Sequence, residues 1–152
     1  LGITKEQAEQ YIKDYFETYP KVKEYMDSLV EMGKSKGYVT SLYGRRRPIP
    51  ELSAKNFMQR QFGERIAMNS PIQGTAADII KIAMNRVDAR LRKENMQSRL
   101  ILQIHDELLV ETKIEEIEEV SHILNEEMIH AAALKVPLIA DVKQGTTWYE
   151  AK

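Results

Sequence analysis

The segment LILQIHDELLVE, Leu100 to Glu111, places a group of polar residues between two apolar runs. The polar residues interrupt a run rich in β-branched types, so two short strands joined by a tight turn fit this segment better than one helix. The polar side chains at or beside the predicted turn are Gln103, His105, Asp106 and Glu107. The segment therefore predicts a buried β-hairpin that presents an imidazole and two neighbouring carboxylates at its turn.

Carboxylates in such a turn have two possible roles. They can simply face water, as turn residues commonly do, and His105 can be a neutral, hydrogen-bonded residue beside them. Alternatively, Asp106 can be half of a magnesium site, because Mg²⁺ commonly takes one or two carboxylates together with waters and substrate phosphate. Adjacent residues of an extended chain point to opposite faces, so we expect only one of Asp106 and Glu107 to be the main ligand of a small site. A two-metal phosphoryl-transfer centre would need a further carboxylate from elsewhere.

The first fifty residues predict two helices followed by a basic loop. Thr4 and Gln7 fit a capping box for a helix near residues 4 to 18, and Pro20 suits the first turn of a second helix. Gly37 offers that helix a stop, and residues 38 to 43 suggest a short strand or extended turn. The arginine run that follows, in GRRRPIPE, indicates either a solvated surface or a contact with phosphate groups.

The rest of the chain predicts three more helices and a strand. A helix capped by Ser53 should run to about Met68, because Pro71 disfavours helical geometry at the residue before it. Helices then follow after the connector SPIQGT and over about residues 114 to 133, and a strand is expected near residues 138 to 143. The core-facing stripe after the connector consists of Ala76, Ile79, Ile80, Ala83, Met84, Val87 and Leu91.

These elements predict an α+β fold, with helices packed on one face of a small antiparallel sheet and an N-terminal helical hairpin. We expect the sheet to combine the residue 100–111 hairpin with the strand near residues 138 to 143, and the boundary to divide residues 1–52 from 53–152.

Composition narrows the class of protein. The chain has 152 residues, a net charge of −1 and 30% charged residues, so it lacks the global basic field of a stand-alone nucleic-acid binder. It has no cysteine, which argues against a disulfide-stapled secreted module and against thiolate metal sites. No apolar run is long enough for a spanning helix, and we expect a soluble, cytoplasmic protein. Because the chain opens on Leu1 and not on methionine, we also expect it to be a piece of a longer protein.

Two stretches together, QIHDELLVE (103–111) and RIAMNSPIQGTAADIIK (65–81), closely resemble the family A DNA polymerases of the bacterial DNA polymerase I type. The first is similar to motif C of that family, and the second to the helix and connector that follow the nascent base pair. Residues 1–20, 37–52 and 136–152 resemble further stretches of the same family in the same order, so the resemblance covers essentially the whole chain.

The resemblance implies roles for particular residues. Asp106 would be the motif C aspartate that binds the catalytic metal ions, with Glu107 a carboxylate of lesser importance, and Gln103 and His105 would contact the primer strand near its 3′ end. The residues along the minor groove would be Arg65, Asn69 and Gln73. Donors suit that groove, because every Watson–Crick pair shows acceptors there.

The resemblance also implies a function. The chain would be part of a bacterial DNA-directed DNA polymerase that extends a DNA primer with dNTPs, using two Mg²⁺ ions. Residues 1–52 would be the end of the fingers subdomain and residues 53–152 a portion of the palm. Its partners would be primer–template DNA and dNTPs, without a membrane.

We find no motif A stretch and no nucleotide-binding fingers helix, so we expect this chain alone to be inactive. A missing upstream strand would leave an open sheet edge, through which we expect the chain to self-associate.

Two other functions remain to be weighed. The chain could be a stand-alone, non-catalytic DNA-binding or interaction module that uses its basic loop and helices. A small metal-dependent hydrolase is disfavoured, because His122 and His130 lie eight residues apart on a predicted helix and no second cluster has ligand spacing.

Overall fold

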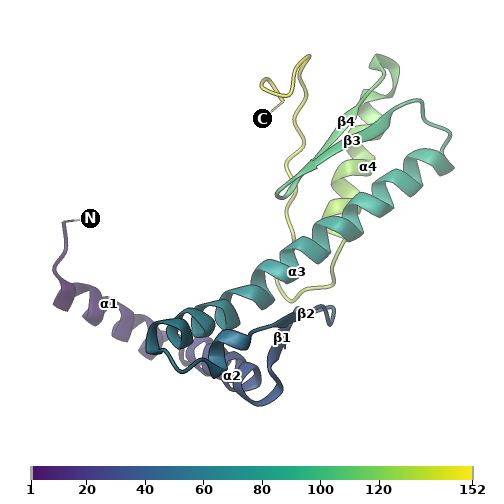
Figure 1. The fold of residues 1–152 in the computed structure, drawn as a ribbon. Helices are drawn as coiled ribbons and strands as arrows, with labels where there is room; N and C mark the ends of the chain where they lie inside the picture. The colour runs from purple at the N-terminus through teal and green to yellow at the C-terminus, as the bar shows by residue number, and fades with distance from the viewer. Residues whose placement is uncertain (1, 152) are drawn as a thin grey trace. The chain divides into compact units, whose positions relative to one another are not determined.

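A computed structural model describes residues 2–151 of the chain, and its contacts divide it into two compact units, residues 1–74 and 75–152 (Figure 1). The helices and the two hairpins give the α+β class expected from the sequence. The assignment of residues 1–52 and 53–152 to two polymerase subdomains is a different kind of division, and it stays a prediction.

The first unit begins with the expected pair of helices, α1 (Lys5–Thr18) and α2 (Pro20–Lys36). The capping box forms as expected: the Thr4 hydroxyl accepts from the Gln7 N–H at 3.2 Å, and the Gln7 side chain accepts from the Thr4 N–H at 2.9 Å. Gly37 ends α2 with φ of 77°, in the left-handed region that glycine tolerates best.

A short hairpin follows, made of β1 (Tyr38–Thr40) and β2 (Arg46–Pro48), and then the 3₁₀ helix η1 (Pro50–Ser53). The predicted strand at 38–43 is thus present over its first half, and the arginine run forms part of its partner strand. These elements cover the core of the first unit, which consists of Val39, Ile49, Leu52 and Ala67, flanked by Val30 and Ile66.

The helix α3 (Phe57–Lys93) corrects the prediction of two helices separated by SPIQGT. Its start is capped by Asn56, whose side chain accepts from Met58 N–H at 2.8 Å, and not by Ser53, which lies in η1. It also continues through Pro71. A proline inside a helix costs about 3 kcal/mol. The helix bears buried residues on both sides of it, Ala67 before and Ile80 after, and their packing outweighs this local preference.

The second unit contains the predicted hairpin, β3 (Arg99–Ile104) with β4 (Glu107–Glu111). After η2 (Ile114–Glu116) comes α4 (Ile117–Ile129), which ends four residues before the expected position. There the backbone tightens into a final turn, because Ala131 N–H donates to the Met128 carbonyl.

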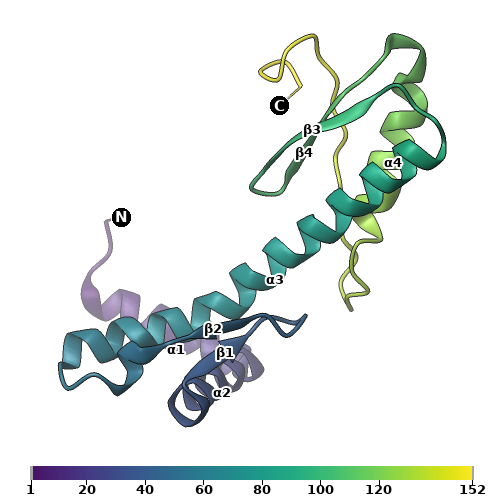
Figure 2. The ribbon, with the colours of Figure 1, turned by 45° about the vertical axis from the view of Figure 1, so that its right-hand side comes forward.

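The core of the second unit lies on one face of its hairpin, as expected for this fold class. Figure 2 shows the hairpin beside α4 and the last turns of α3. The core residues are Val87, Leu91, Val120 and Ile123, with Met96, Leu108, Val110 and Leu124 packed against them. Four of the stripe residues predicted after the connector are buried: Ile80, Ala83, Val87 and Leu91.

The strand expected near residues 138–143 does not form, so the prediction of a larger sheet was wrong for this chain. This segment is extended and is held to α4 by Asn125, whose amide donates to the Ala140 carbonyl at 2.8 Å. Between the segment and the hairpin lies a cavity that both of them line. Because strands pair at about 4.8 Å, a segment across a cavity cannot join the ladder.

Within residues 2–151, none of the helices combines the length and apolar character that a membrane span requires.

Candidate functional site

The motif-like residues of the second unit lie at the tip of its hairpin. Ile104 pairs with Glu107, which leaves His105 and Asp106 as a two-residue turn. His105 has φ of 51°, in the left-handed region that costs a residue with a side chain roughly 1–2 kcal/mol. Gln103 donates its Nε2 hydrogen to the His105 carbonyl at 2.8 Å. The turn therefore holds an unfavourable backbone conformation beside the candidate metal ligand.

A β-bulge interrupts the pairing of β3 with β4. Leu100 pairs with Val110, but the next pair is Leu102 with Leu109, so Ile101 has no partner on β4. Leu108 and Val110 pack against the core, and residues of both strands line a cavity of about 1150 Å³.

Asp106 and Glu107 are both exposed and both line this cavity, together with the C-terminal segment. Two carboxylates supply the hard oxygen ligands that Mg²⁺ prefers, with its other positions open to water or phosphate. Among residues 2–151, however, no three His, Cys, Asp or Glu side chains come together as a metal-binding group. The donors fit one side of a magnesium shell and do not make a closed site.

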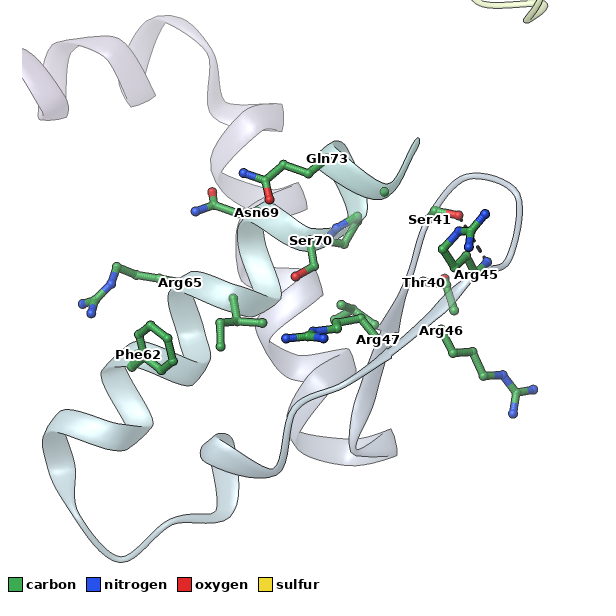
Figure 3. Close-up of a pocket in the computed structure, with 14 residues that line it drawn as sticks. Thr40, Ser41, Arg45, Arg46, Arg47, Phe62, Arg65, Asn69, Ser70 and Gln73 are labelled. Atoms are coloured by element: carbon green, nitrogen blue, oxygen red, sulfur yellow. Dashed lines mark hydrogen bonds between the residues drawn. The ribbon is translucent and has the colours of Figure 1, made fainter. Parts of the chain in front are cut away.

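The other candidate residues border a pocket of about 720 Å³ in the first unit (Figure 3). Arg65, Asn69 and Gln73 are four residues apart on the unbroken α3, so they share one face. Figure 3 shows all three side chains projecting on the same side of the helix. The continuity of α3 through Pro71 therefore makes this face longer than the sequence indicated.

Three arginines of the β1–β2 hairpin complete the pocket. Arg47 extends toward α3 near Ser70, whereas Arg46 extends away from it (Figure 3). The Arg46 guanidinium lies over the Tyr38 ring, 4.8 Å from its centroid. The Arg45 N–H donates to the Ser41 hydroxyl at 3.2 Å. Aspartate and glutamate are absent from the residues that line the pocket. Arg46, Arg47 and Arg65 bring positive charge to the lining of this pocket, which favours an anionic ligand.

That the arginine run and the α3 face line one pocket was not predicted, although the arginine run itself was recognised. The sequence could not show it, because it depends on the packing of the short hairpin against α3. The expected residues divide between the units: Arg65, Asn69 and Gln73 belong to the first, and Gln103, His105, Asp106 and Glu107 to the second.

A partly buried set of hydrogen bonds around Glu116, a clasp that the sequence did not indicate, secures the base of the β3–β4 hairpin. The Glu116 carboxylate accepts from the N–H groups of Gln97 at 2.9 Å and Ser98 at 2.8 Å. The buried Ser98 hydroxyl in turn accepts from the Lys113 N–H at 3.0 Å. The hydrogen bond from Gln97, followed by that from the Ser98 hydroxyl, lowers the pKa of Glu116.

An ion-pair network joins α3 to α4 within the second unit. Arg90 donates to Glu126, Glu94 and Glu127, and these bonds, led by that to Glu126, raise the pKa of Arg90. The same bond from Arg90 lowers the pKa of Glu126. His122 lies 3.4 Å from Glu126. This network is structural, since it lies along a helix pair and its members are paired with one another.

Comparison with known proteins gives consistent matches over the whole chain. The family model for DNA polymerase family A matches residues 1–150. DNA polymerase I of Geobacillus stearothermophilus is 51% identical over all 152 residues, and so is DNA polymerase I of Bacillus subtilis (strain 168). The chain spans 17% of the length of each of these relatives.

A solved structure agrees with this match. The POL domain of Pol1 from M. smegmatis, in complex with DNA primer-template and dNTP, superimposes with a TM-score of 0.94 at 40% identity. The match covers 99% of this chain and 27% of that one.

Proposed function

Because the chain belongs to DNA polymerase family A, we propose that it is part of a bacterial, cytoplasmic DNA-directed DNA polymerase that extends a DNA primer with dNTPs. In this proposal residues 1–52 belong to the fingers and residues 53–152 to the palm. The observation that carries the proposal is the pocket beside the Arg65 face, because Arg46, Arg47 and Arg65 line it and offer cationic donors to a polyanion.

The DNA contacts follow from the chemistry of these donors. Arg65, Asn69 and Gln73 suit the minor groove, where acceptors at purine N3 and pyrimidine O2 occur in every pair, so they would sense pair geometry without selecting a sequence. Arg46 and Arg47 suit phosphate oxygens, which supply most of the affinity of such complexes. His105 and Gln103 would contact the primer strand near its 3′ end.

Asp106 would hold Mg²⁺ at the hairpin tip, with Glu107 as a secondary carboxylate. When bound, the metal ions would stabilise negative charge on the attacking and leaving oxygens of nucleotidyl transfer. The protein contributes a stiff turn that presents the Asp106 carboxylate to a cavity open to phosphate and water.

The experiment for this proposal measures binding of a fluorescent primer–template duplex by anisotropy over a series of salt concentrations. We expect Arg46→Ala to weaken binding and to reduce the salt slope by about 1, because one phosphate contact is lost. Arg65→Ala should weaken binding as well. Arg92→Ala is the matched control, since Arg92 is exposed in the second unit and pairs with Asp88. The proposal would be contradicted if all three variants lost the same affinity for DNA, or if none of them lost any.

The two-stranded β3–β4 sheet has unpaired edges on both strands within the part of the chain that the structure describes. Unpaired edges favour pairing with another chain, so we also propose that this chain self-associates in solution. Light scattering that shows only monomer at high concentration would exclude this.

A further inference from the structure

The side chain of Gln103 closes the turn that carries Asp106. Gln103 lies on β3, and its amide reaches past the end of the strand to donate to the His105 carbonyl at 2.8 Å. His105 is the residue in the left-handed conformation, with φ of 51°. The Gln103 side chain is half-buried, whereas Asp106 is exposed to the cavity.

This hydrogen bond acts on the peptide group that leads into Asp106. The His105 carbonyl and the Asp106 N–H belong to one planar unit, which rotates as a rigid body between two Cα atoms. The pairing of Ile104 with Glu107 fixes the ends of the turn and leaves this rotation as its main freedom. A donor held on the carbonyl therefore fixes the plane, and the plane sets the direction of the Asp106 Cα–Cβ bond.

The left-handed conformation is unfavourable for His105, and a hydrogen bond to its carbonyl offsets a cost of this size. No other side-chain hydrogen bond to the turn residues is present among residues 2–151. Loss of the Gln103 donor should therefore shift the turn toward other backbone conformations, and not only widen the fluctuations of the present one.

We infer that Gln103 is a positioning residue, which holds the His105–Asp106 peptide plane and so aims the Asp106 carboxylate. The inference rests on the proposed function, in which that carboxylate is the metal ligand. It differs from the primer contact expected of Gln103, because one of its two amide hydrogens is already used inside the turn.

The first test examines the turn by NMR in the isotope-labelled chain, without metal or DNA. Wild type should show a scalar coupling across the hydrogen bond between Gln103 Nε2 and the His105 carbonyl carbon. In Gln103→Met and Gln103→Glu, which lack the donor, the coupling should vanish, the His105 carbon shifts should leave the range of positive φ, and the Asp106 amide should move. Gln103→Glu keeps the length and polarity of the side chain if the methionine variant fails to fold.

Rescue and control variants separate positioning from general damage. Gln103→Lys restores a donor of similar reach, so it should return the His105 shifts toward wild type. Gln59→Met removes an exposed glutamine from the first turn of α3 and should leave the turn resonances unchanged. Unchanged His105 and Asp106 shifts in both donor-free variants would overturn the inference.

The second test titrates the same proteins with MgCl₂ and follows the Asp106 and Glu107 resonances. Loss of a residue that orients a metal ligand typically weakens metal binding 10–100-fold, and we expect at least a roughly 10-fold higher midpoint in Gln103→Met. An unchanged midpoint despite altered His105 shifts would overturn the claim that Gln103 aims the carboxylate. If the wild-type coupling is present but Asp106 does not respond to Mg²⁺, the proposed metal function fails while the turn geometry stands.

Discussion

Single residues decide how the β3–β4 hairpin presents its carboxylates. The polar interruption of an apolar run correctly predicted a turn at His105 and Asp106, because turn chemistry is local. The left-handed backbone of His105 and the clasp at Glu116 could not be predicted. Both features depend on side chains that bond to backbone groups only after the chain has turned. Neither histidine nor glutamate has a conformational preference strong enough to predict them from the sequence.

The clasp at Glu116 leads to a pH prediction. The folded pKa of this carboxyl lies below its ordinary value of 4.5, so its contribution to stability is present above that value and is lost as the pH falls through the folded pKa. We expect Glu116→Gln to lower the free energy of unfolding at pH 7 and the difference from wild type to shrink below pH 4.5. Urea unfolding at a series of pH values measures this. A difference that is constant down to low pH would show that the charge of Glu116 is not what stabilises the clasp.

At the scale of elements, local rules predicted most helices and strands but failed where packing competes with them. Proline chemistry predicted a break before Pro71, yet α3 continues, because residues buried on either side hold the chain in a helix. The reverse occurred at residues 138–143, where strand-like sequence stays unpaired for want of a neighbour. A strand needs backbone hydrogen bonds to a neighbouring segment, so the sequence of one segment alone cannot predict it.

Two glycines of α3 test how closely the first unit is packed. A Cβ at Gly63 would lie 2.9 Å from the Leu52 backbone nitrogen, whereas at Gly74 its nearest neighbour would be the Ser41 Cβ at 3.4 Å. Alanine gains about 1 kcal/mol over glycine in a helix, but overpacking costs about 1–3 kcal/mol.

We therefore expect Gly63→Ala to lower the urea midpoint and Gly74→Ala to leave it unchanged or raise it. Hydrogen exchange of the residues around each site provides a local check. If the two substitutions have equal effects, the close approach of η1 to α3 is not a constraint on stability.

For the whole molecule, the sequence predicted the α+β class and the family, and both are confirmed. The candidate site differs from the sequence prediction in its extent. Arg65 and Asn69 share one helix face as expected, and the unbroken α3 extends this face to Gln73, which was not expected. Asp106 and Glu107 supply only one side of a metal shell. A further metal-binding carboxylate would come from another segment of the protein, so the sequence of the β3–β4 hairpin cannot identify it.

This incompleteness predicts that the chain alone does not extend DNA. A primer-extension assay with Mg²⁺ and all four dNTPs should give no product, with a full-length family A polymerase as the positive control. The physical reason is that two-metal transfer needs carboxylates on both ions, and the described residues provide one pair. Robust extension by this chain would show that no further aspartate is required.

The most direct measurement of the central claim maps where a divalent cation binds, using Mn²⁺ as a paramagnetic substitute for Mg²⁺ on the isotope-labelled chain. We predict that amide broadening is strongest at residues 104–108 and is lost in Asp106→Asn. Broadening that is centred on the acidic start of α4, at Glu118 and Glu119, or that persists in Asp106→Asn, would contradict the assignment of Asp106 as the metal-binding carboxylate.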